Sequence, residues 1–180
     1  MARVPFVEKD QADPRVAEVY RKLEAGGHQM LNLYKAVANA PALFTDFFRL
    51  ANRILFQTGL PPRLRELAIL RVGDLARTPY EYTKHVQIGL KAGVPRAQID
   101  ALARWSESNE FDDAERAVLQ YTDEVSRGYR ANDKTFAALK RHLDDARIVE
   151  LTVIIGFYEM ICRVLEALQV EIEDEAFQPF

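Results

Sequence analysis

Two helices and the break between them are encoded in one stretch, Leu60-Pro-Pro-Arg-Leu-Arg-Glu-Leu-Ala-Ile-Leu-Arg-Val-Gly-Asp-Leu-Ala-Arg-Thr-Pro-Tyr-Glu-Tyr-Thr-Lys-His-Val86. The first helix, predicted over 61–77, is apolar on almost every side, which indicates a buried element. The break has the form of a helix start, because Thr78 is a favoured N-cap, proline is tolerated at the first helical position, and glutamate at the third fits a capping box. The second helix is predicted over 79–92, before Gly93.

Three ionisable side chains of this stretch, Glu66, Glu81 and His85, are predicted to lie away from solvent. At about 100° per residue, Glu81 and His85 stand one turn apart on a sector of small and apolar residues. The predicted solvent face of the same helix is formed by Thr83, Lys84, Gln87 and Lys91. Glu66 falls on the buried helix, where a carboxylate needs a partner or a function. Because histidine exchanges protons near neutral pH, the three residues predict an acid–base site.

Each of these residues also has a structural explanation. Glu81 can act only as the reciprocal half of a capping box. His85 can be a half-buried histidine with one nitrogen bonded, and Glu66 can pair with Arg63 or with another helix. The combination, rather than any single residue, favours a site.

The spacing of Glu66 and His85, followed by Ala92-Gly93-Val94-Pro95, resembles the carboxymuconolactone decarboxylase and alkylhydroperoxidase D superfamily. The peroxidase branch of that superfamily reads Glu-x11-Cys-x2-Cys-x3-His, and here Thr78 and Glu81 occupy the two cysteine positions. The redox pair is therefore absent. The decarboxylase branch instead carries a glutamate four residues before the histidine, as Glu81 stands before His85.

This resemblance is specific over about 60–101 and looser over nearly the whole chain. It implies an all-α fold, a helical bundle of the alkylhydroperoxidase D-like type with about 7–9 helices, forming one domain over residues 1–180. It implies His85, Glu81 and Glu66 as catalytic residues, with no cofactor and no metal. It also implies a homotrimer or homohexamer with sites near subunit contacts.

Composition is consistent with one globular protein. The 180 residues are 48% hydrophobic, enough for one substantial core. A net charge of −3 provides no electrostatic footprint for nucleic acid, and no basic run suggests a membrane surface. The N-terminus lacks a signal-peptide core, so a cytoplasmic location is expected. The single cysteine, Cys162, excludes an internal disulfide and is predicted to be a packed thiol rather than a nucleophile.

The rest of the chain reads as helices joined by short loops. Helices are predicted over 13–24, 31–38, 42–56, 61–77, 79–92, 95–105, 112–127, 133–143 and 146–170. Arg65–Gly73 resembles Val149–Gly156, which leaves open an internal duplication. The last helix carries more apolar surface than a small monomer readily covers, which favours a homo-oligomer.

Three further residues are predicted to bind substrate: Arg71, Tyr80 and Tyr34. Arg71 projects between leucines of its helix, and a buried arginine there either pairs with a carboxylate, the commoner case, or anchors a substrate. Tyr80 and Tyr34 are expected to line the pocket around Glu66 and His85.

Three functions follow from these patterns. The favoured one is a cofactor-independent, decarboxylase-like or lyase-like enzyme acting on a small lactone, carbonyl or unsaturated carboxylic acid by general acid–base catalysis. A second is a non-catalytic oligomer that binds a small ligand. A third, an alkylhydroperoxidase-like antioxidant protein, is disfavoured because one thiol cannot cycle through an internal disulfide.

Overall fold

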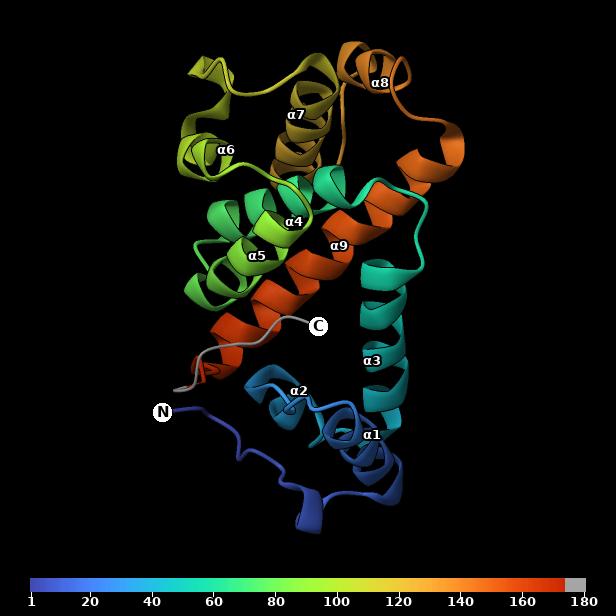
Figure 1. Cartoon of the computed structure of the whole chain (residues 1–180), viewed down its shortest axis with the longest axis vertical. Helices are drawn as coiled ribbons and strands as arrows, with labels where there is room; N and C mark the ends of the chain where they lie inside the picture. The colour runs from blue at the N-terminus through green and yellow to red at the C-terminus, as the bar shows by residue number, and fades with distance from the viewer. Residues whose placement is uncertain (174–180) are drawn as a thin grey trace. The chain divides into compact units, whose positions relative to one another are not determined.

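The computed structural model describes residues 1–173, and over this range the chain is entirely helical with no strand (Figure 1). The α-helices are α1 (Pro14–Ala25), α2 (Asn32–Val37), α3 (Pro41–Phe56), α4 (Pro62–Ala76), α5 (Pro79–Lys91), α6 (Arg96–Ala101), α7 (Asp113–Gly128), α8 (Asp133–Leu139) and α9 (Asp145–Leu168). Two short 3-10 helices cover Lys9–Gln11 and Leu102–Glu107. The predicted all-α bundle is confirmed.

The chain divides into two compact units. Met1–Gln57 and residues 163–173 form the first, and Thr58–Cys162 forms the second. Helix α9 begins in the second unit and ends in the first. The prediction of one domain over the whole chain stays a prediction.

The first unit contains α1, α2 and α3. Asp13 caps α1 by accepting a hydrogen bond from the backbone N–H of Arg15, as a helix start with an acidic N-cap requires. The ring of Tyr34 lies edge-on to the rings of Phe47 and Phe48, with centroids 6.2 and 4.9 Å away. Tyr34 is thereby part of an aromatic cluster of α2 and α3.

The second unit is organised around α4, whose sequence is apolar on most sides. Every residue from Arg65 to Gly73 is buried, which confirms the predicted buried element. Helix α4 packs against α5 and α7 (Figure 1). The hydrophobic core around these helices contains Leu67, Leu70, Val94, Ile99, Leu102, Trp105, Phe111 and Leu119. The buried polar residues of α4 are held by this packing.

Glycine allows α4 and α5 to approach each other closely. A side-chain carbon at Gly89 would lie 3.2 Å from Leu70 Cδ1, and one at Gly73 would lie 3.4 Å from the backbone nitrogen of Tyr82. The first distance is shorter than ordinary van der Waals contact, so a side chain at position 89 would require the Leu70 side chain to shift by a few tenths of an ångström.

Several helix boundaries differ from the predicted ones. Pro41 is the first residue of α3 rather than a separator, because proline needs no N–H partner there. The helix predicted over 95–105 divides into α6 and a 3-10 helix with a non-helical residue, Arg104. The helix predicted to end at 143 ends at Leu139. Asp112 caps α7 in a complete capping box with Glu115.

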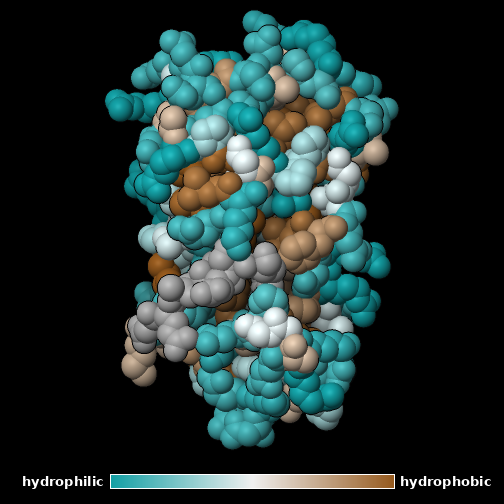
Figure 2. Space-filling model, in the orientation of Figure 1, coloured by the Kyte–Doolittle hydropathy of each residue, from teal (hydrophilic) through white to brown (hydrophobic). Residues whose placement is uncertain are grey.

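Packing within one chain buries more of the apolar surface of α9 than its sequence suggests. Ile148, Leu151, Ile154 and Ile155 are at most 5% exposed. Val149, Val153 and Met160 remain 62%, 47% and 40% exposed, so one face of α9 keeps exposed apolar side chains. Hydrophilic residues dominate the view in Figure 2, with hydrophobic side chains showing between them. No helix within residues 1–173 is both long and apolar enough to cross a membrane.

Candidate functional site

The turn between α4 and α5 places the candidate site. Arg77 adopts a left-handed conformation with φ 53°, and Thr78 and Pro79 start the next helix immediately afterwards. Helix α5 therefore folds back onto α4, with Glu81 in its first turn and His85 in its second. Glu66 of α4 faces them.

His85 bridges two carboxylates. Its Nδ1 lies 2.7 Å from Glu66 Oε2, and its Nε2 lies 3.0 Å from Glu81 Oε1. The three residues are 5%, 0% and 3% exposed, respectively. The structure thus brings together the three residues predicted to form an acid–base site and removes them from solvent.

Arg65 joins the same cluster and was not predicted. Its Nε donates to Glu66 Oε1 over 2.9 Å, and the side chain is 8% exposed. Neighbouring residues on a helix point about 100° apart, so a contact between positions 65 and 66 is not expected from helical spacing. The cluster consequently runs Arg65–Glu66–His85–Glu81, with cations and carboxylates alternating.

Tyr158 of α9 covers the imidazole. The rings of Tyr158 and His85 meet edge to face, with centroids 4.9 Å apart and planes at 87°. The phenol ring limits the orientations of the imidazole in addition to the two carboxylates. No pattern in the sequence indicates this contact, because it joins segments that are distant along the chain.

The environment holds His85 in its charged form. Burial by itself lowers the pKa of His85, but the charges of Glu66 and Glu81 outweigh it and raise this pKa to about 10. Burial likewise tends to raise the pKa of Glu66, yet His85 and Arg65 lower it overall. At neutral pH the resting site contains an imidazolium that donates one N–H to each carboxylate.

Two expectations for the flanking residues are wrong, and one open alternative is decided, because Glu66 pairs with His85 of another helix. Thr78 makes no capping hydrogen bond, and its hydroxyl is buried without a partner, so Glu81 is not half of a capping box. Lys84, assigned to the solvent face, is 5% exposed and places its Nζ 5.7 Å from the centroid of the Tyr80 ring. Arg63 pairs with Glu115 at 2.6 Å rather than with Glu66.

Arg71 lies in a second ionic cluster on α4. Its guanidinium binds both carboxylate oxygens of Asp123 at 2.5 and 2.9 Å and Asp74 at 2.6 Å. It also donates to the carbonyl oxygens of Leu102 and Ala103. Of the two alternatives for this buried arginine, these contacts provide the carboxylate partner.

The other predicted residues are distributed differently. Tyr80 is 4% exposed and belongs to α5, one residue before Glu81. Tyr34 belongs to the first unit, where it packs against α3. Cys162 forms no disulfide within residues 1–173 and is 3% exposed, which agrees with a packed cysteine.

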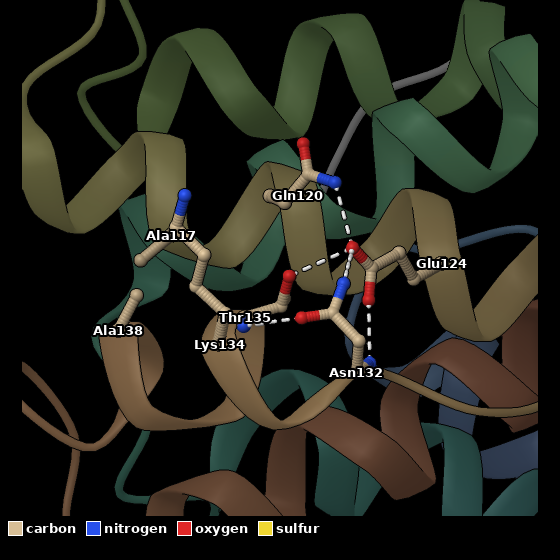
Figure 3. Close-up of a pocket in the computed structure, with 7 residues that line it drawn as sticks. All are labelled: Ala117, Gln120, Glu124, Asn132, Lys134, Thr135 and Ala138. Atoms are coloured by element: carbon tan, nitrogen blue, oxygen red, sulfur yellow. Dashed lines mark hydrogen bonds between the residues drawn. The ribbon is translucent and has the colours of Figure 1, made fainter.

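A cavity of about 330 Å³ lies between α7 and α8, apart from these residues (Figure 3). Its central polar group is Glu124, which accepts hydrogen bonds from Gln120, Thr135 and both the backbone and side chain of Asn132. These bonds tie the start of α8 to α7. Holding α8 against α7 is therefore a sufficient structural explanation for these polar residues.

Comparisons with known proteins agree with the predicted resemblance. The model of the carboxymuconolactone decarboxylase family matches residues 41–124. No curated protein sequence matches the chain at a significant level.

Solved structures agree on the fold. A protein of unknown function from Agrobacterium tumefaciens is 26% identical, with a TM-score of 0.72 over 77% of this chain and 96% of that one. An alkylhydroperoxidase AhpD core from Ralstonia eutropha, a peroxidase-related protein, is 18% identical, with a TM-score of 0.84 over 96% and 93%. The debrominase Bmp8 is 22% identical, with a TM-score of 0.75 over 89% and 87%. At the identities of the last two, the likeness concerns the fold.

Proposed function

Because residues 41–124 match the carboxymuconolactone decarboxylase family, we propose that the chain is an acid–base enzyme acting on a small lactone, carbonyl compound or unsaturated carboxylic acid. The observation that carries this proposal is the buried imidazole of His85 held between Glu66 and Glu81. Buried titratable groups that shift each other's pKa are typical of catalytic sites. Catalysis is assigned to His85, Glu81 and Glu66.

The resting geometry determines which group must move. Both ring nitrogens of His85 are engaged, so a substrate can reach the imidazole only when one carboxylate withdraws. Glu66 is held on its other oxygen by Arg65, whereas Glu81 has no second ion pair within the described residues. Glu81 is therefore the carboxylate that gives way, and Glu66 keeps Nδ1–H oriented.

The withdrawal of Glu81 also changes the acidity of His85. Its charge is one of the two that raise the pKa of His85 to about 10. Removing that charge lowers the pKa toward neutrality, where a proton donor is most effective. The site would thus hold its proton securely when closed and release it more readily when a substrate has displaced Glu81.

Decarboxylation of a vinylogous acid illustrates the step. The bond to the carboxylate carbon breaks, carbon dioxide leaves, and the electron pair remains on a dienolate. Nε2–H of His85 then protonates the dienolate carbon, leaving a neutral imidazole that regains a proton from water. Tautomerisation or hydration of a related compound would use the same groups in the same positions.

The proposal includes self-assembly as a homotrimer or homohexamer. It is supported by the apolar side chains of Val149, Val153 and Met160, which share one face of α9 and stay exposed in a single chain. Light scattering tests it directly, and a monomeric protein would contradict it. Ile155 is fully buried within the chain, so Ile155→Lys would test folding rather than assembly.

Turnover tests the catalytic assignment. A panel of muconolactones, muconic acids and aromatic acids is offered to the wild type and to His85→Ala, and product is followed by NMR. The variant should lose about 10²–10⁴-fold in turnover, the usual contribution of a positioned acid–base group. His142→Ala, which removes an exposed histidine, is the matched control and should retain activity. A wild type that binds panel members without converting them would support the non-catalytic binding alternative.

A further inference from the structure

We propose that the outer edge of the Arg65 guanidinium binds the carboxylate of a small organic acid. This inference deepens the proposed function and rests on it in one respect: it takes the His85 cluster to be a ligand site. It identifies which side chain would hold the acid and therefore which class of compound the site selects.

The observation behind the proposal is an arginine that is buried but mostly unpaired. A guanidinium carries five N–H donors. Arg65 uses only its Nε, which donates to Glu66, and within residues 1–173 its two terminal nitrogens have no protein partner. Neither terminal nitrogen is among the fully buried side-chain atoms that lack a partner, so the 8% exposure of the side chain includes them.

Arg71 shows how the same fold treats a purely structural arginine. Its side chain is 5% exposed, close to that of Arg65, and all three of its nitrogens bind protein oxygens. Burying donors without partners costs free energy, which is why Arg71 is surrounded by acceptors. The side chain of Arg65 is buried to a similar extent, but its terminal nitrogens reach the surface and have no protein acceptors, as expected for a group whose partner is supplied by a ligand.

The chemistry of that ligand follows from the donor. The terminal N–H groups of an arginine form a planar pair that matches the two oxygens of a carboxylate, and such charged, bidentate bonds are among the strongest hydrogen bonds. The fully ionised cluster has two cations, Arg65 and His85, and two anions, Glu66 and Glu81. The cluster therefore carries no net negative charge that would repel a carboxylate, and Arg65 presents a cation at one end of the cluster.

Arg65 lies on the Nδ1 side of the imidazole. Glu66 binds Arg65 through one oxygen and His85 Nδ1 through the other, at 2.9 and 2.7 Å. One carboxyl group thus separates the guanidinium from the imidazole, whereas the proposed proton donor, Nε2–H, faces Glu81. A short acid bound to Arg65 would lie beside the cluster, and its reacting carbon would have to extend past Glu66 to meet Nε2–H.

Binding of two acids and their uncharged amides tests the proposal. Sorbate and benzoate are titrated against sorbamide and benzamide by ligand-observed NMR, using wild type, Arg65→Gln and Arg65→Lys. Wild type should prefer each acid over its amide, and Arg65→Gln should lose about 10–100-fold of that preference, the value of a charge-assisted bidentate bond. Arg65→Lys, which keeps the charge but not the planar pair, should fall between them.

The matched control is Arg96→Gln. Arg96 is an exposed arginine paired with Asp100, so its replacement changes the net charge equally without touching the cluster. It should keep the wild-type preference. If Arg65→Gln does not fold, as judged by circular dichroism, Arg65→Lys carries the test, since a structural role alone would not change the acid-to-amide ratio.

The outcomes separate this inference from the proposed function. An unchanged acid-to-amide ratio in both Arg65 variants would overturn the inference, and so would a wild type without preference for the acids; the loss of turnover in His85→Ala would still stand. A ratio that falls with Arg65 replacement, together with normal turnover in His85→Ala, would support the carboxylate site and overturn the acid–base mechanism.

Discussion

Two buried ionic clusters lie on α4, one around Arg71 and one around His85, and they differ in their central cation. The Arg71 cluster contains a guanidinium bound to Asp123 and Asp74, with every nitrogen occupied. The His85 cluster contains an imidazolium between Glu66 and Glu81. In both clusters, pairing with opposite charges offsets the free-energy cost of burying a charged group.

The two central cations, a guanidinium and an imidazolium, differ in whether they can release a proton. A guanidinium does not lose its proton in a protein, so the central cation of the Arg71 cluster stays charged at all accessible pH values. An imidazolium can lose its proton, and the carboxylates around it determine the pH at which it does so. Pairing alone therefore does not indicate function, and it is the titratable central cation at His85 that supports the proposed site.

The largest expected effect is the loss of stability in Arg71→Met. The replacement removes the main cation of Asp123, which is 11% exposed, and of the more exposed Asp74, and breaking a buried ion pair typically costs about 3–5 kcal/mol in the free energy of unfolding. Urea denaturation followed by circular dichroism measures it. Arg96→Met, which breaks an exposed pair, should cost no more than about 0.5 kcal/mol. A loss below about 1 kcal/mol in Arg71→Met would remove the structural role assigned to that cluster.

The next effect is a pH dependence of stability that belongs to the His85 cluster. The pKa of His85 rises to about 10 in the folded state from an unfolded value near 6.5, so its stabilisation is complete below about pH 6.5 and disappears as the pH rises through about 10. Between pH 7 and 9 the wild type should lose up to about 1.4 kcal/mol per pH unit relative to His85→Gln.

The control for this linkage is His142→Gln, which removes an exposed histidine. It should follow the wild-type slope. Equal slopes for wild type and His85→Gln would mean that folding does not raise the pKa of His85.

Arg65→Met should have a smaller effect than Arg71→Met. Glu66 keeps His85 as a charged partner at 2.7 Å, so the replacement leaves no carboxylate without a cation. We expect a loss of about 1–3 kcal/mol, the value of a hydrogen bond to a charged group. If both arginine replacements cost the same in urea denaturation, the two clusters are equally structural and the contrast between them fails.

The smallest effect is expected for Cys162→Ser, because neither cluster contains a thiol. Cys162 is 3% exposed, and Thr78 and Glu81 occupy the positions of the redox cysteines. Peroxide consumption with a dithiol reductant should be negligible in the wild type and unchanged in the variant. Robust peroxidase activity that disappears on this replacement would reinstate the antioxidant alternative.

Local sequence patterns predict a large part of this arrangement. Pro79 and Gly93 mark the ends of α5, and the spacing between Glu66 and His85 indicates that they belong together. Glu81 follows from its position one turn before the histidine. The helix ends and the position of Glu81 depend on backbone geometry that each short segment determines for itself, whereas the pairing of Glu66 with His85 across two helices is what the family resemblance implies.

The remaining contacts depend on which elements surround the helices. Lys84 lies on the face that helical periodicity assigns to solvent, and its burial results from tertiary packing that periodicity does not describe. Tyr158, which contacts His85, belongs to α9, a helix that is distant from α5 along the chain. Arg65 and Arg71 are both arginines on a buried helix, and only the three-dimensional position of their acceptors shows that Arg71 is fully paired and Arg65 is not.

The protonation state of His85 tests the central claim most directly. In protein labelled with nitrogen-15, the two ring nitrogens of His85 can be assigned by comparison with His85→Gln and followed from pH 6 to 10. An imidazolium bound to two carboxylates predicts that both nitrogens stay protonated at pH 7.5 and that the ring titrates near 10. A ring that is neutral at pH 7.5, with a single protonated nitrogen and a pKa close to 6.5, would contradict the account.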